Sequence, residues 1–202
     1  TTMESVNVLV TTAIGDESLQ RIASVSPRIK LTDISNLFHT EQIYYTTKES
    51  AAPGVKEKLD ALLAEAEVLY GMRLPYNLFT RAPGLKWIQL VSAGVNRYLD
   101  AEMMASPVIL TNLSGVFDTP IGEFVLSRML MLVKRAPFYF QSKQEKQWKR
   151  ADGTVLRSKT VGVVGLGSIG REVARLAKAF GMRVLATRRS AKRVGRARYV
   201  DI

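Results

Sequence analysis

Short apolar runs alternate with amphipathic stretches along the first half of the chain. The apolar runs predict strands at residues 6–10, 29–34, 68–70, 87–91 and 108–111. The stretches 17–25 and 55–64 carry apolar side chains at helical spacing, whereas the polar and aromatic stretch 38–47 gives no clear prediction. Strands separated by helices predict a parallel sheet that is covered on both faces and binds ligands at the carboxyl ends of its strands.

A long helix is predicted after the last of these strands. Thr119 is a good N-cap and Pro120 a favoured first helical residue, and apolar positions recur at helical spacing to about Arg135. Pro137 interrupts this pattern, and a polar, basic stretch follows. That stretch contains aromatic residues that no local apolar pattern accompanies: Phe138, Tyr139, Phe140 and Trp148. Such aromatics are typical of a subunit interface, and the alternative is that they cover the core of a further part of the protein.

The most informative motif is the glycine fingerprint, residues 165–170, which reads Gly165-Leu166-Gly167-Ser168-Ile169-Gly170. It follows an apolar run at 160–164 and precedes a predicted helix at 171–180 and a strand at 183–187. In this context G-x-G-x-x-G predicts a dinucleotide site, with the phosphates held at the helix N-terminus. The first glycine permits the tight turn, the second the approach of a pyrophosphate, and the third close helix–strand packing. Ordinary turn glycines are the alternative.

Composition and charge narrow the classes of function. The chain has no cysteine and one histidine, which excludes disulfides, thiolate chemistry and a histidine-rich metal site. No apolar run is long enough for a membrane helix, and we expect a cytoplasmic protein. The net charge is +11, and 18 of the 29 basic residues lie after residue 133 with only four of the 18 acidic ones.

This basic half has two interpretations. It could bind an anionic partner, or it could be balanced by an acidic portion beyond residue 202. We favour the second, because a nucleotide domain that opens at 165 is incomplete at 202. Nucleic-acid binding is a weak interpretation, because the strand–helix pattern already accounts for the basic residues as a solvated face.

Several segments together resemble the D-isomer-specific 2-hydroxyacid dehydrogenases. Typical of that family is the run from Lys159 to Ala174, with its continuation over 177–184. Residues 92–96 resemble the family's substrate loop. Residues 115–126 resemble the helix that crosses between its two domains. The resemblance implies an α/β protein with a flavodoxin-like, parallel-sheet substrate domain over 1–112. A Rossmann-type nucleotide-binding domain would follow over 113–202, incomplete here. It also implies a small 2-keto or 2-hydroxy acid substrate and homodimerisation through the nucleotide domain.

The resemblance also assigns binding residues. The backbone N–H groups of Ala93, Gly94 and Val95 would hold the substrate carboxylate, with a simple turn after a strand as the alternative. At the end of the second strand of the nucleotide domain, the cofactor would contact Thr187, Arg188, Arg189 and Ser190. No acidic residue lies between 184 and 190 to accept a ribose 2′-OH, and arginines bind a 2′-phosphate. This favours NADP over NAD, with a solvated basic strand end as the alternative.

The catalytic residues of the family have no match here. The family uses an arginine, a carboxylate and a histidine that all follow the second strand of the nucleotide domain. His39 lies in a predicted polar loop, matches no family motif and is expected at the surface. No catalytic residue is therefore assigned, and residues 1–202 alone are expected to be inactive. One hypothesis is the amino-terminal part of an oxidoreductase that transfers hydride between NADP(H) and a 2-keto acid. The alternative is a truncated, non-catalytic module that binds nucleotide or another anion.

Overall fold

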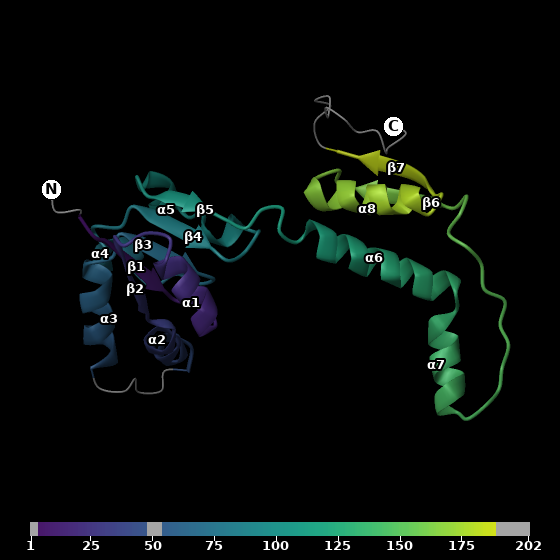
Figure 1. Ribbon diagram of the computed structural model, residues 1–202, viewed down its shortest axis with the longest axis horizontal. Coiled ribbons are helices and arrows are strands. Elements are labelled where there is room, and N and C mark those ends of the chain that lie inside the picture. The colour runs from purple at the N-terminus through teal and green to yellow at the C-terminus, as the bar shows by residue number, and fades with distance from the viewer. Residues whose placement is uncertain (1–3, 48–53, 189–202) are drawn as a thin grey trace. The chain divides into compact units, whose positions relative to one another are not determined.

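The computed structural model describes residues 4–47 and 54–188, and the chain divides into two compact units, Thr1–Ser114 and Gly115–Ile202 (Figure 1). The first unit is a five-stranded parallel sheet with strand order β2-β1-β3-β4-β5. This is the flavodoxin-like order. Its strands are β1 (Val6–Val10), β2 (Ile29–Asp33), β3 (Val68–Gly71), β4 (Trp87–Leu90) and β5 (Ile109–Thr111). The predicted strands and the predicted α/β, parallel-sheet class are therefore confirmed.

Helices join these strands and supply the other half of the core. They are α1 (Asp16–Ala23), α2 (Ser35–Thr47), α3 (Val55–Ala64), α4 (Leu78–Arg81) and α5 (Ala101–Ala105), with a short 3₁₀ turn at Asn96–Tyr98. Leu59 and Leu63 of α3 are fully buried against Leu69 of β3 and Ile88 of β4. Alternate positions of the strands thus face this cluster, as the period of two along a strand requires.

Helix α2 was not predicted, and it also corrects the expected position of His39. The residue lies within α2 and not in a loop, and its side chain is exposed as expected. The buried stripe of this segment does have helical spacing, at Ile34, Ser35, Phe38 and Glu41. Two members of that stripe are polar, so a search for apolar periodicity does not detect it.

The polar member Glu41 is buried because it has a distant partner. Arg81 of α4 donates from Nη2 to Glu41 Oε1 at 2.7 Å and from Nε to Asp60 Oδ1 of α3 at 2.5 Å. Burial opposes ionisation of Asp60, but the hydrogen bonds from Lys56 and Arg81 outweigh it and hold the pKa of Asp60 below its ordinary value. This network fastens α2 to α3 and α4.

The second unit contains three helices and a parallel strand pair among its described residues. Its elements are α6 (Asp118–Val133), α7 (Ala136–Gln144), β6 (Thr160–Val164), α8 (Ser168–Ala179) and β7 (Arg183–Thr187). Strand β6 pairs in parallel with β7. Ala174 and Ala177 of α8 and Val184 of β7 are buried together, and Leu126, Met129 and Leu130 of α6 pack against them.

Two predictions about α6 and α7 are corrected. Helix α6 begins at Asp118 with Phe117 as its N-cap, so Thr119 is not the cap and Pro120 is the third helical residue. A proline is tolerated there because the N–H groups of the first turn have no acceptor within the helix. Pro137 lies in the first turn of α7 for the same reason, and the polar stretch that follows it is helical to Gln144.

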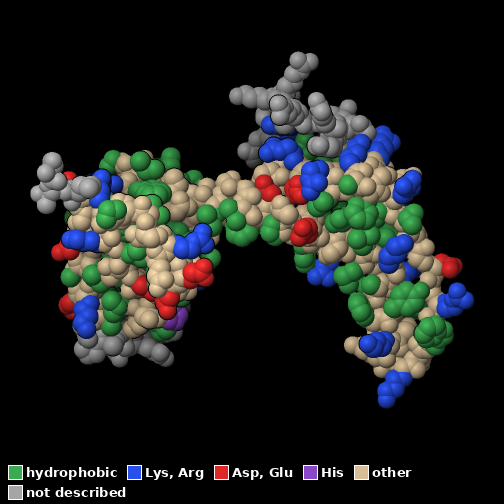
Figure 2. Space-filling model, in the orientation of Figure 1, with side chains coloured by type: hydrophobic (Ala, Val, Ile, Leu, Met, Phe, Trp, Pro, Cys, Tyr) green, Lys and Arg blue, Asp and Glu red, His purple; other side chains and the backbone are tan. Residues whose placement is uncertain are grey.

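Basic side chains are spread over the second unit. Figure 2 shows Lys and Arg distributed across its visible face and not gathered in one patch. No helix in the described part of the chain is long and apolar enough to cross a membrane.

Candidate functional site

The glycine fingerprint forms the turn between β6 and α8. Gly165 has φ +97°, a conformation that side-chain-bearing residues rarely adopt. The N–H groups of Gly165 and Leu166 both donate to the carbonyl of Thr187, at 3.0 and 3.2 Å. The turn is thereby fixed to the carboxyl end of β7.

The other two glycines of the fingerprint are required for different reasons. A Cβ on Gly170 would lie 2.2 Å from the carbonyl oxygen of Gly165 and 3.1 Å from Cγ1 of Val163, so the helix could not pack on β6 at its present distance. A Cβ on Gly167 would meet nothing within 4 Å. The space at Gly167 is therefore open to a ligand, whereas the space at Gly170 is filled by the protein.

Unpaired backbone donors face this open space. The intrahelical bonds of α8 begin with Arg171, whose N–H donates to the Gly167 carbonyl at 3.0 Å. The N–H groups of Ser168, Ile169 and Gly170 have no acceptor among the described residues. Together with the positive end of the helix dipole, they favour an anion at this position. These residues therefore fit the pyrophosphate of a dinucleotide.

The residues predicted to favour NADP over NAD lie at the end of β7. Thr187 is the last residue of the strand, and Arg188 follows it with an exposed side chain. Arg189 and Ser190 lie outside the described residues. No acidic side chain occurs from Val184 to Arg188, so nothing in this stretch would repel a 2′-phosphate.

The loop of residues 92–95 follows β4, and all of its carbonyl groups are occupied. The Ser92 carbonyl accepts from the Leu113 N–H at 3.1 Å, and the Ala93 carbonyl accepts from Asn112 Nδ2 at 2.7 Å. The Gly94 carbonyl accepts from Ser92 Oγ at 3.0 Å. The Val95 carbonyl accepts from the Tyr98 N–H at 2.8 Å.

The opposite is true of the amide groups of this loop. Within the described residues, the N–H groups of Ala93, Gly94 and Val95 donate to no acceptor. A Cβ on Gly94 would meet nothing within 4 Å, so the backbone is accessible there. Since all four carbonyl groups already accept hydrogen bonds, the backbone groups of 93–95 that have no partner are donors, which suits a carboxylate.

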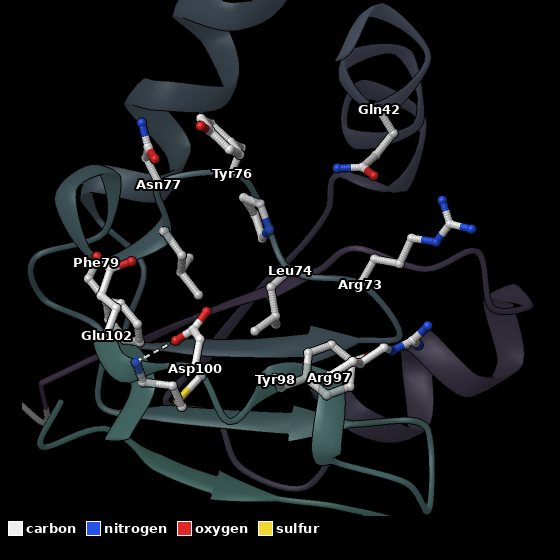
Figure 3. Close-up of a pocket in the computed structure, with 13 residues that line it drawn as sticks. Gln42, Arg73, Leu74, Tyr76, Asn77, Phe79, Arg97, Tyr98, Asp100 and Glu102 are labelled. Atoms are coloured by element: carbon white, nitrogen blue, oxygen red, sulfur yellow. Dashed lines mark hydrogen bonds between the residues drawn. The ribbon is translucent and has the colours of Figure 1, made fainter. Parts of the chain in front are cut away.

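A side-chain clamp connects this loop to the loop after β3, and Figure 3 shows its two side chains, Arg97 and Tyr98. The Tyr98 hydroxyl donates to the Met72 carbonyl and accepts from Arg97 Nη2 at 2.5 Å. Arg97 Nη2 also donates to the Met72 carbonyl at 3.2 Å, and its guanidinium lies over the Tyr98 ring at 4.8 Å. The sequence directs attention to Asn112 as a strand-end position, but sequence reasoning missed its hydrogen bond to the Ala93 carbonyl and missed this clamp, because the partners are distant in sequence and no motif marks them.

The chain was compared with known proteins. Residues 126–201 match the family model described as D-isomer specific 2-hydroxyacid dehydrogenase, NAD binding domain. D-3-phosphoglycerate dehydrogenase of Methanocaldococcus jannaschii is 32% identical over 143 residues, 68% of this chain and 27% of that protein. Glyoxylate reductase of Aeropyrum pernix is 30% identical over 154 residues, 70% of this chain and 46% of that protein.

The chain belongs to the D-isomer-specific 2-hydroxyacid dehydrogenase family. A solved structure agrees with this assignment: a family protein from Aeromonas salmonicida matches with TM-score 0.72 and 25% identity over 95% of this chain and 56% of that one. The resemblance inferred from the motifs is confirmed. The chain spans less than half the length of the two curated relatives. The family match contains the whole glycine fingerprint, and the 92–95 loop lies outside it.

Proposed function

We propose that the glycine fingerprint binds a nicotinamide dinucleotide and that the protein takes part in hydride transfer between this cofactor and a small 2-keto or 2-hydroxy acid. One observation carries the proposal. Three unpaired N–H groups at the start of α8 face an open space that is kept clear by Gly167. When bound, the cofactor supplies the hydride, and the residues of this chain bind and orient it.

The 92–95 loop is proposed to hold the substrate carboxylate through Ala93, Gly94 and Val95. The donor-only surface of this loop supports the proposal, because an anion there accepts hydrogen bonds without meeting a carbonyl oxygen. The two curated relatives are named for glyoxylate and D-3-phosphoglycerate, which are small acids of the expected kind. The substrate domain is accordingly proposed over 1–112 and the nucleotide domain over 113–202.

NADP is proposed to bind more tightly than NAD. Arg188 follows β7 directly. In Rossmann domains that bind NAD, an acidic residue near this position accepts a hydrogen bond from the ribose 2′-OH. Replacing Arg188 with Asp is expected to lower the affinity for NADPH by about tenfold or more, the order expected for loss of a charge-assisted contact, while sparing NADH.

Residues 1–202 are proposed to bind cofactor without turning it over. Reduction of a keto group needs a proton donor near the reacting oxygen, and the single histidine, His39, lies on α2 of the first unit. A non-catalytic nucleotide- or anion-binding module remains the alternative function.

The experiment is calorimetric titration of the whole chain with NADPH and NADH. Gly167→Ala adds a methyl group where no protein atom lies within 4 Å, so the fold is retained while the phosphate space is filled. Gly162→Ala in β6 is the matched control, because its methyl also meets nothing. We expect Gly167→Ala to weaken NADPH binding at least about a hundredfold, the effect of displacing several charge-assisted hydrogen bonds. Equal affinity in both variants would contradict the proposal.

A cytoplasmic homodimer is the proposed state of the protein. Tyr139, Phe140 and Trp148 in and after α7 are exposed in the single chain, Trp148 to 96%. An exposed aromatic cluster of this kind is typical of an interface. Sedimentation of the whole chain tests this, and a monodisperse monomer at micromolar concentration would contradict it.

A further inference from the structure

The segment that follows the 92–95 loop is held by an exposed arginine. Arg97 lies in the short 3₁₀ turn Asn96–Tyr98 and is exposed. Its Nη2 nevertheless donates to two acceptors, the Met72 carbonyl at 3.2 Å and the Tyr98 hydroxyl at 2.5 Å. Its guanidinium also lies 4.8 Å from the centroid of the Tyr98 ring (Figure 3). An exposed arginine ordinarily samples many rotamers, so these three contacts give the guanidinium a fixed orientation.

The carbonyl at the centre of this clamp, that of Met72, is itself anchored. A Cβ on Gly71 would lie 1.8 Å from Thr11 Oγ1, so the glycine makes room for this hydroxyl directly after β1. Thr11 Oγ1 donates to the Arg73 carbonyl at 3.2 Å, and the Gly71 carbonyl accepts from the Val91 N–H at 3.0 Å. The residues on both sides of Met72 are therefore tied to the ends of β1 and β4, which makes the Met72 carbonyl a fixed point.

The two ends of the 92–95 loop are held by different parts of the first unit. At its start, the residues that follow β5 hold the first two carbonyl groups. At its end, the Tyr98 N–H donates to the Val95 carbonyl at 2.8 Å, and the Tyr98 ring is buried in the core. Arg97 lies between Val95 and Tyr98 in the sequence. Its hydrogen bond to the anchored Met72 carbonyl therefore fixes the backbone at this end of the loop.

We propose that Arg97 is a positioning residue for the carboxylate site, because it holds the N–H groups of Gly94 and Val95 in the geometry that receives the anion. The role rests on the proposed function of this loop. Arg97 acts through the Met72 carbonyl and the Tyr98 hydroxyl and is assigned no contact with the ligand. An anion gains from several donors only when all of them are correctly placed, so a small shift of the backbone weakens binding more than it weakens the fold.

The test is Arg97→Met in the whole chain, with Arg21→Met in α1 as the matched control. The methionine keeps an apolar side chain beside the Tyr98 ring but removes the donor and the charge. The control removes the same charge from another exposed position of the first unit. In NMR spectra without ligand, the amide signals of Gly94 and Val95 should shift in Arg97→Met and stay in place in Arg21→Met.

Titration with glyoxylate measures the consequence for binding. We expect Arg97→Met to bind glyoxylate about tenfold more weakly than wild type, which corresponds to the loss of about one charge-assisted hydrogen bond. The affinity ratio should be the same at low and at high salt, because salt screens the attraction of a distant charge but does not restore a displaced donor. The denaturant midpoint should change little, since exposed contacts contribute little to stability.

Three results would overturn the proposal. The first is that the Gly94 and Val95 signals of unliganded Arg97→Met are unmoved. The second is that this variant binds glyoxylate as tightly as wild type or Arg21→Met does. The third is an affinity ratio that disappears at high salt, which would mean that the arginine attracts the anion by its charge alone. A wild-type chain in which glyoxylate fails to shift Gly94 would contradict the proposed function instead, because the unliganded spectra test the role of Arg97 without it.

Discussion

The glycine fingerprint and the 92–95 loop both expose backbone N–H groups after a parallel strand, but the protein constructs them differently. In the fingerprint the donors are free because they belong to the first turn of α8. In the 92–95 loop the N–H groups belong to no helix or strand, and every carbonyl is held by a donor, including the side chain of Asn112. One element depends on local glycines and a helix, the other on partners elsewhere in the first unit.

This difference determines what each element tolerates. Replacing Gly170, where protein atoms fill the Cβ position, should disrupt the structure of the fingerprint. Replacing Gly167, where the Cβ position is empty, should weaken only ligand binding. The 92–95 loop should weaken in steps as its distant hydrogen bonds are removed, because its shape is shared among several contacts.

The largest effect is expected for Gly170→Ala. The new methyl group would lie 2.2 Å from the Gly165 carbonyl oxygen, so α8 must move away from β6. Overpacking of this kind costs about 1–3 kcal/mol or more. Hydrogen exchange should show faster opening of β6 and α8, with the strands of the first unit unchanged. Protection equal to that of Gly162→Ala would show that the close packing is dispensable.

Asn112→Ala should have a smaller and more selective effect. It removes the 2.7 Å hydrogen bond to the Ala93 carbonyl, worth about 1 kcal/mol. We expect glyoxylate to bind about fivefold more weakly, with NADPH binding unchanged, when both ligands are titrated by calorimetry. Equal weakening of both ligands would show that the two elements are not independent.

Tyr98→Phe tests the clamp behind the loop. The variant keeps the buried ring and removes the hydroxyl that donates to the Met72 carbonyl, which Arg97 still contacts. The expected cost is about 0.5–1 kcal/mol in the unfolding free energy of the first unit, measured by denaturant titration. A loss above about 3 kcal/mol would mean that the hydroxyl anchors far more than one hydrogen bond.

The smallest effect concerns the helix that carries the fingerprint. Hydrogen bonds from Arg175 lower the pKa of Glu172 below its ordinary 4.5. The pair therefore stabilises the fold above that ordinary pKa, and the contribution disappears as the pH falls through the lowered value. Arg175→Gln should cost less than about 0.5 kcal/mol at pH 7, because the pair is partly exposed. Thermal unfolding at pH 7 and pH 3 measures this, and a difference between wild type and variant that grows at pH 3 would contradict it.

The same contrast explains how far the sequence could be interpreted. The fingerprint, its strand and its helix were predictable because their determinants lie within a few residues of one another. Helix α2 was not, since its buried Glu41 is compatible with a core only through Arg81, 40 residues away. Likewise, nothing near residue 93 indicates that Asn112 and Leu113 hold the loop, or that Thr11 requires a glycine at 71.

The most direct test of these assignments is an amide NMR spectrum of the whole chain, recorded with NADPH and then with glyoxylate. NADPH should shift the signals of Ser168, Ile169 and Gly170 and leave those of Ala93, Gly94 and Val95 in place. Glyoxylate alone should do the reverse. If NADPH leaves the fingerprint signals unmoved, or if glyoxylate shifts them in place of the 92–95 loop, the two assignments are wrong.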